Sequence, residues 1–127
     1  MNSRPIPSSG EQIPVIGLGT WQTFDVGNDL PKLNNLEKIL KTFVQKGGSF
    51  IDASPMYGTA EKVVGDLATK LGIRHQLFMA TKVWTKGAAA GIQQMEASMQ
   101  KMKAQPCLLY TSPSPRDATL SRMPSSA

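Results

Sequence analysis

The sequence has little of what several classes of protein require. Its 127 residues include a single cysteine, Cys107, which excludes an intramolecular disulfide and a zinc site built from several cysteines. No apolar run reaches the roughly 18–20 residues of a membrane-spanning helix, and the first five residues lack the apolar stretch of a signal peptide. We therefore expect a cytoplasmic protein with no metal site and no membrane contact.

Positive charge is in excess, but the sequence does not concentrate it. Lys and Arg number 14 against 9 Asp and Glu, a net charge of +5. The lysines fall one by one on predicted solvated helix faces, with no aromatic side chains between them. Proteins that bind nucleic acids gather charge and aromatic rings on one surface. The sequence therefore predicts no nucleic-acid partner.

Length allows one domain, and the composition changes within it after Pro106. Residues 107–127 are rich in serine and proline and cannot bury enough apolar surface to offset the entropy of ordering. Moreover, LLYTSPSPRD at 108–117 and SRMPSSA at 121–127 resemble the translation of a synthetic sequencing adapter or vector end. We expect part of one domain over 1–106 and a disordered, artefactual tail over 107–127.

Before that break, predicted strands and helices alternate. A turn-rich cluster at 8–11 lies between two extended runs and predicts a β-hairpin that leads into a strand ending at Gly19. Short apolar runs predict further strands at 49–53 and 77–82. Helical spacing and terminal Pro or Gly residues predict helices at 31–46, 59–71 and 88–103. This order predicts an α/β fold with a parallel sheet covered by helices.

The same patterns predict which side chains face inward. In the third helix, the apolar residues at helical spacing are Ile92, Met95, Met99 and Met102. In the strands, we expect Val15, Ile51 and Met79 to lie on the inner face of the sheet.

Chemically capable residues follow the predicted strands directly, where repeated βα units place their working groups. The three strand ends carry Gly19-Thr20-Trp21, Asp52 with Tyr57, and Lys82 with Trp84. This set suits reduction of a carbonyl, whose oxygen must receive a proton when the carbon gains a hydride. Tyr57 could donate that proton, Lys82 could stabilise the resulting phenolate, and Asp52 could hold Lys82 charged.

Each of these residues also has a plainer explanation. Asp52 could cap a loop, Tyr57 could lie at a rim, and Lys82 could be a solvated strand end. Trp21 and Trp84 could belong to the core or wall a pocket. His75 lies before the third strand, at the opposite end of the sheet, and is predicted to be solvated.

Three segments resemble the aldo/keto reductases. They are GLGTW at 17–21, IDASPMYGTAE at 51–61 and LFMATKVW at 77–84, within a similarity that runs from Arg4 to Lys103. The resemblance implies the N-terminal portion of a (β/α)₈ TIM barrel, a β-hairpin plus about three βα units. It also implies that Tyr57 is the proton donor, that Lys82 activates it, and that Asp52 is the partner of Lys82.

The same resemblance implies NADPH as cofactor and a small aldehyde or ketone as substrate. Gly19, Thr20, Trp21 and Asp52 correspond to residues that bind the nicotinamide end, and Trp21 and Trp84 to walls of the substrate pocket. The family's catalytic histidine is expected shortly after Pro106, where this sequence has none. We therefore expect the 127 residues to be an inactive fragment of a reductase. The alternative is a non-catalytic cofactor-binding module, similar to the barrel-shaped accessory subunits of potassium channels.

Overall fold

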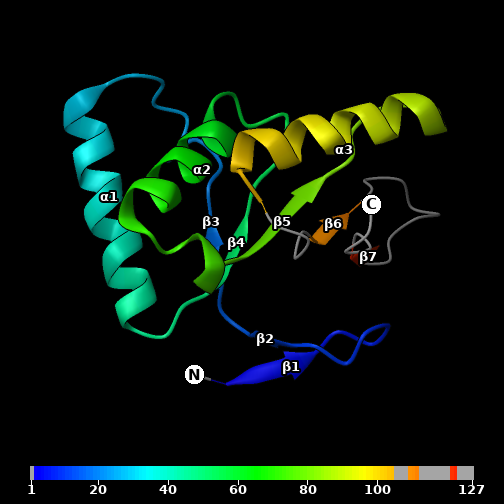
Figure 1. Cartoon of the computed structure of the whole chain (residues 1–127), viewed down its shortest axis with the longest axis horizontal. Coiled ribbons are helices and arrows are strands. Elements are labelled where there is room, and N and C mark those ends of the chain that lie inside the picture. Colours follow the sequence, from blue (N-terminus) through cyan, green and yellow to red (C-terminus); the bar gives the residue numbers. More distant parts are fainter. Residues whose placement is uncertain (1, 105–108, 112–120, 123–127) are drawn as a thin grey trace.

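The computed structural model of the chain describes residues 2–104, 109–111 and 121–122. Among these residues, β1 and β2 form an antiparallel hairpin, and a second sheet has the order β3-β4-β5-β6-β7. Helices α1, α2 and α3 lie on one side of the second sheet, and the hairpin lies apart from them (Figure 1). The elements are β1 Ser3–Pro5, β2 Gln12–Pro14, β3 Leu18–Gly19, α1 Leu30–Gln45, β4 Phe50–Asp52, α2 Ala60–Leu71, η1 Arg74–Gln76, β5 Phe78–Lys82, α3 Ala88–Met102, β6 Leu109–Thr111 and β7 Ser121–Arg122.

The predicted alternation of strands and helices is confirmed between residues 18 and 102. Strands β3, β4 and β5 are parallel neighbours, so α1 and α2 are crossovers between adjacent strands. The Asp29 side chain caps α1 by accepting a hydrogen bond from the Lys32 N–H at 3.2 Å. Helix α2 ends at Gly72, whose φ of 67° lies in the left-handed region that favours glycine.

The main core lies between the sheet and the helices. Its fully buried side chains come from all three helices and from β4, and they include Leu40, Ile51, Val64 and Met102. Ile51 and Met79 were predicted on the inner face of the sheet, and this is wrong because both pack beneath the helices. Side chains alternate along a strand, so Asp52 and its alternate neighbour Phe50 take the opposite face.

That opposite face carries a smaller apolar cluster. Phe50 and Phe78, which are paired in the sheet register, stack with ring centroids 5.9 Å apart. The hairpin covers part of this face, with Ile6 buried and Ile13 packed against the cluster. Val15, also predicted on the inner face, follows the hairpin and is 52% exposed.

Helix α3 packs along only part of its length. Met102 is fully buried, and Met95 and Met99 contact the main core. Ile92 was predicted to face inward, but it is 51% exposed. The first turns of α3 extend beyond α2 (Figure 1), which agrees with this exposure.

Two short strands lie within the segment that the sequence predicted to be disordered. Strand β6 pairs in parallel with β5, and β7 pairs antiparallel with β6. The expectation of a disordered, artefactual tail over 107–127 stays a prediction. The backbone of residues 109–111 pairs along the edge of β5, which composition does not reveal. The rest of the predicted tail lies outside the described residues.

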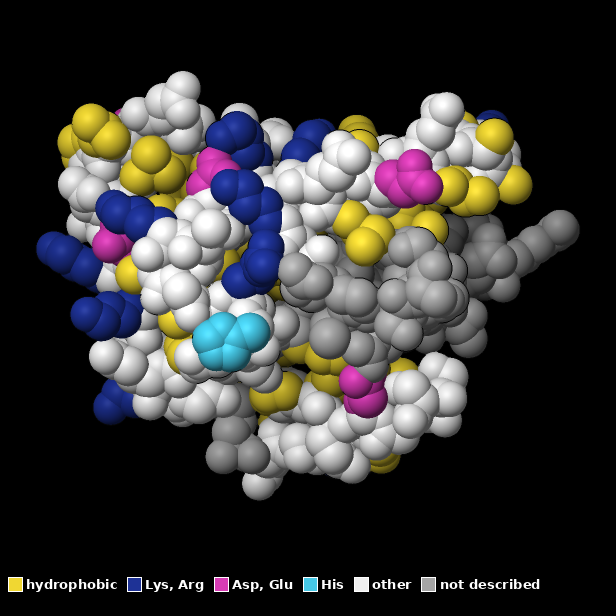
Figure 2. Space-filling model, in the orientation of Figure 1, with side chains coloured by type: hydrophobic (Ala, Val, Ile, Leu, Met, Phe, Trp, Pro, Cys, Tyr) yellow, Lys and Arg dark blue, Asp and Glu magenta, His cyan; other side chains and the backbone are white. Residues whose placement is uncertain are grey.

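Charged side chains on the helical face are mixed in sign. Lys and Arg side chains are spread over α1 and α2 with Asp and Glu among them (Figure 2). Several are paired, as in Lys70 with Glu37 at 2.7 Å and Lys103 with Asp66 at 3.0 Å. No helix in the described part is long and apolar enough to cross a membrane.

Two helix glycines, Gly65 in α2 and Gly91 in α3, differ in how closely other atoms approach them. A Cβ at Gly65 would overlap the Lys101 carbonyl oxygen and the Met102 backbone, so Gly65→Ala should lower the free energy of unfolding by about 1–3 kcal/mol. A Cβ at Gly91 would meet only the Val83 side chain, at 3.4 Å. Gly91→Ala should therefore raise the free energy of unfolding by about 0.5–1 kcal/mol, since alanine favours the helix interior. Denaturant unfolding of the full gene product would test both, and equal effects would contradict this packing.

Candidate active site

The carboxyl ends of β4 and β5 bring together a carboxylate, that of Asp52, and an ammonium group, that of Lys82. Lys82 ends β5, and its Nζ donates hydrogen bonds to Asp52 Oδ1 at 2.9 Å and Oδ2 at 2.8 Å, and to the Ala53 carbonyl at 3.0 Å. The Lys82 side chain is 23% exposed and that of Asp52 39%. Three acceptors thus hold an ammonium group that is partly withdrawn from water.

Tyr57 lies in the turn after β4 and faces the same ammonium group. Lys82 Nζ lies 4.9 Å from the centroid of the Tyr57 ring, a cation–π distance. The Tyr57 N–H donates to the Ser54 carbonyl, and the Tyr57 carbonyl accepts from the Ala60 N–H, each at 3.0 Å. The ring also packs against the main core. The structure therefore places the three predicted catalytic residues, Asp52, Tyr57 and Lys82, in one group.

The loop after β3 is attached to the same strand end. Thr20 is buried, and both its N–H (3.1 Å) and its hydroxyl (2.9 Å) donate to the Asp52 carbonyl. Trp21 follows and is 63% exposed. Among the described residues, no atom outside Gly19 and its two chain neighbours would lie within 4 Å of a Cβ placed on Gly19. Open space beside Gly19, with the partly exposed Asp52 carboxylate in register beside it, fits the approach of a flat ring.

Trp84 follows β5 and is also half exposed. The backbone N–H of Trp84 donates to the side-chain oxygen of Gln94, and this hydrogen bond fixes the start of the loop against α3. The structure thus places Trp21 and Trp84 beyond the ends of β3 and β5, where neither is part of the core. His75 lies in η1, before β5, and is exposed as predicted.

Asp25 is one of two residues that the sequence reasoning missed. Its Oδ1 accepts from both the N–H and the hydroxyl of Thr59, each at 2.9 Å. These hydrogen bonds, first that of the N–H and then that of the hydroxyl, hold the pKa of Asp25 below its usual 3.8. The resulting stabilisation is present at neutral pH and is lost as the pH falls through the folded-state pKa. The two residues are 34 positions apart, so no local pattern links them.

Glu61 is the second missed residue, and it lies under the site. It is 1% exposed, and its Oε2 accepts a hydrogen bond of 2.7 Å from the hydroxyl of Thr81, which precedes Lys82 in β5. Its Oε1 has no hydrogen-bond partner among the described residues. An acidic residue on the inward stripe of a predicted helix is the signal that could have identified it.

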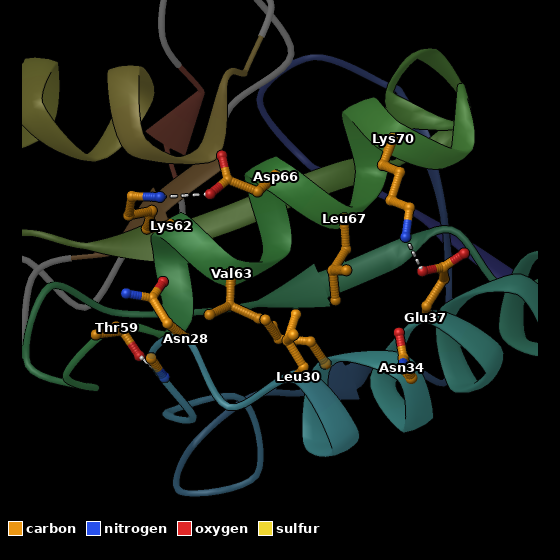
Figure 3. A pocket seen from close by; sticks show the side chains of 12 residues that line it. Asn28, Leu30, Asn34, Glu37, Thr59, Lys62, Val63, Asp66, Leu67 and Lys70 are labelled. Atoms are coloured by element: carbon orange, nitrogen blue, oxygen red, sulfur yellow. Dashed lines mark hydrogen bonds and ion pairs between the residues drawn. The ribbon is translucent and has the colours of Figure 1, made fainter.

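A hollow of about 360 Å³ between α1 and α2 is separate from this group. Figure 3 shows its lining, which includes Thr59, Leu67 and the pairs Lys62–Asp66 and Lys70–Glu37. None of the predicted catalytic or cofactor-binding residues lines it.

Comparison with known proteins gives one consistent family. The sequence model described as "Aldo/keto reductase family" matches residues 15–111. Methylglyoxal reductase YeaE of Escherichia coli is 33% identical over 115 residues, which are 87% of this chain and 39% of that protein. Glycerol 2-dehydrogenase (NADP(+)) of Saccharomyces cerevisiae is 35% identical over 78 residues, 61% of this chain and 22% of the yeast protein.

Solved structures agree with these relatives. An aldo/keto reductase from Klebsiella pneumoniae, in complex with NADP and acetate, is 27% identical with a TM-score of 0.67, over 80% of this chain and 35% of that chain. Another, in complex with NADPH, is 25% identical with a TM-score of 0.69, over 87% of this chain and 39% of that chain. The chain thus spans well under half the length of these proteins, and its fold is the N-terminal portion of their (β/α)₈ barrel. By its sequence match over residues 15–111 and by this shared fold, the chain belongs to the aldo/keto reductase family.

Proposed function

We propose that the gene product carrying this sequence is an NADPH-dependent reductase of small aldehydes and ketones. The observation that carries the proposal is the position of Lys82 Nζ, which is bonded to both Asp52 oxygens and lies over the Tyr57 ring. In such a group the phenol can protonate a developing alkoxide, the cation can stabilise the phenolate that remains, and the carboxylate can hold the cation in place.

Tyr57 is the proposed proton donor. NADPH, when bound, supplies the hydride that reduces the carbonyl carbon. The Tyr57 phenol gives its proton to the carbonyl oxygen as that oxygen gains negative charge, which yields the alcohol and leaves a phenolate. Lys82 stabilises the phenolate through its positive charge, and Asp52 holds Lys82 in place. The phenolate then regains a proton from solvent.

Three features support the assignment of cofactor and substrate residues. Open space beside Gly19 and the exposed ring of Trp21 would admit the nicotinamide end next to Asp52, and Thr20 fixes that loop to β4. Trp21 and Trp84, 63% and 53% exposed, would wall the substrate on two sides. The named relatives act on small carbonyl or hydroxyl compounds, which agrees with this substrate class.

The non-catalytic alternative is tested by the same assay. No observation on the described residues favours a cofactor-binding module without turnover. The full gene product should oxidise NADPH when methylglyoxal or dihydroxyacetone is added, whereas a binding module would take up NADPH without turnover.

Tyr57→Phe should lower kcat about 10²–10⁴-fold, because the carbonyl oxygen loses its proton donor. The dissociation constant for NADPH, measured by fluorescence titration, should stay within about twofold. A phenylalanine variant that reduces methylglyoxal at the wild-type rate would rule out Tyr57 as the donor.

Lys82→Met should lower kcat at least about 10²-fold, because the phenolate loses its stabilising cation. Lys70→Met is the matched control, since Lys70 is 62% exposed and pairs with Glu37 on the surface. Its kcat should not change. Equal rates for the two variants would show that Lys82 is an ordinary strand end. Thermal unfolding should accompany both assays, because removal of Lys82 leaves the Asp52 carboxylate unpaired.

When residues 1–127 are expressed alone, they should show no cooperative unfolding transition and should not bind NADPH. The face of the sheet that carries Phe50 and Phe78 is only partly covered, and a barrel of this family covers it by closing eight strands. Differential scanning calorimetry and NADPH fluorescence would test this. A cooperative transition together with micromolar, salt-resistant binding would show that this part is self-sufficient.

A further inference from the structure

We propose that Asp25 is a positioning residue that holds the Tyr57 turn against the loop after β3 and so fixes the phenol for proton transfer. This role rests on the proposed function of Tyr57 as the proton donor. Asp25 itself lies outside the group of Asp52, Tyr57 and Lys82, and it acts through the two residues that follow Tyr57.

The contact is made at three points. Asp25 Oδ1 accepts from the Thr59 N–H and from the Thr59 hydroxyl, each at 2.9 Å. The Thr59 hydroxyl in turn accepts from the Gly27 N–H at 3.0 Å (Figure 3). Gly58 has a φ of 57°, and a Cβ on it would overlap the Asp25 carboxyl group. The carboxylate thus lies directly against the residue after Tyr57, at a position where only glycine fits.

The loop that carries Asp25 is itself fixed. Phe24 is 1% exposed in the main core, and its N–H donates to the Thr20 carbonyl at 3.1 Å. Val26 also packs against the core. Asp25 therefore projects from between two anchored residues, although its own side chain is exposed. An anchored carboxylate is a rigid acceptor, and hydrogen bonds to a charged acceptor are stronger than neutral ones.

The consequence falls on the Tyr57 ring. Before Tyr57, the turn is held by the N–H bond to Ser54, and after it by Thr59. Without Asp25, both of its bonds to Thr59 are lost. The Gly27 N–H bond to the Thr59 hydroxyl and the Ala60 N–H bond to the Tyr57 carbonyl remain, and they leave the turn a wider range of positions relative to Lys82. Displacements of about 1 Å can cost up to 10²-fold in rate when proton transfer needs a set distance. NADPH binding does not depend on the phenol and should not change.

The experiment compares Asp25→Ala with Asp29→Ala in the full gene product. Asp29 lies in the same loop and also accepts from a backbone N–H, that of Lys32, but among the described residues its side chain pairs with Lys32 and makes no hydrogen bond to the Tyr57 turn. Asp25→Ala should lower kcat for methylglyoxal about tenfold, with KM and the NADPH dissociation constant within about twofold. Asp29→Ala should leave all three unchanged.

Two further variants separate positioning from general loss of stability. Asp25→Asn keeps an acceptor oxygen for the Thr59 N–H and should recover kcat to within about threefold of wild type. Asp25→Ala combined with Thr59→Val should lower kcat by less than the product of the two single effects, because both variants remove the bond between the Thr59 hydroxyl and Asp25. Amide hydrogen exchange of Thr59 should become faster in Asp25→Ala and not in Asp29→Ala.

The outcomes distinguish this role from the proposed function. A wild-type protein that reduces methylglyoxal while Asp25→Ala keeps its kcat would overturn the role of Asp25 alone. So would an equal loss of kcat in Asp25→Ala and Asp29→Ala. A wild-type protein that binds NADPH and reduces neither methylglyoxal nor dihydroxyacetone would overturn the proposed function, and the role of Asp25 with it.

Discussion

The ion pair between Lys82 and Asp52 is the interaction on which the site depends. It joins the carboxyl ends of two neighbouring strands, and a third acceptor, the Ala53 carbonyl, belongs to the same strand end. The pair is possible only because parallel pairing brings the ends of β4 and β5 to one edge of the sheet. The Asp52 carbonyl meanwhile receives both donors of Thr20. Three strand ends are therefore fixed relative to one another around one residue.

Alternation along the strands decides what each face of the sheet can do. Ile51 and Met79 go to the helices, where they are almost fully buried, and Asp52 and Lys82 go to the other face. That second face is apolar at its amino end, where Phe50 and Phe78 stack beside the hairpin, and polar at its carboxyl end. A side chain on the helical face would be sealed from any substrate, so the polar pair and the core must occupy opposite faces.

Sequence patterns predicted the elements and the three central residues because both have local signals. The helices are marked by Pro31, by Gly72 and by apolar spacing, and Asp52, Tyr57 and Lys82 each follow a recognisable strand. The errors concern relations between elements. Burial of Ile92, for example, depends on how far α3 extends past α2. Asp25 could not be found from its surroundings in the sequence, because its partner lies 34 residues away.

The contact of Asp25 with Thr59 also determines how α2 begins. Thr59 is the residue before α2, and its side chain makes no capping bond to the helix, because its hydroxyl is bonded to Asp25 and Gly27. Besides Glu61 in the first turn of the helix itself, the Asp25 carboxylate, from the loop before α1, lies at this positively polarised helix end. Helix α2 therefore gains this stabilisation only after the chain has brought β3 and β4 together. An isolated peptide of α2 would lack it, so during folding the first turn of this helix should become stable with the β3–β4 pairing and not ahead of it.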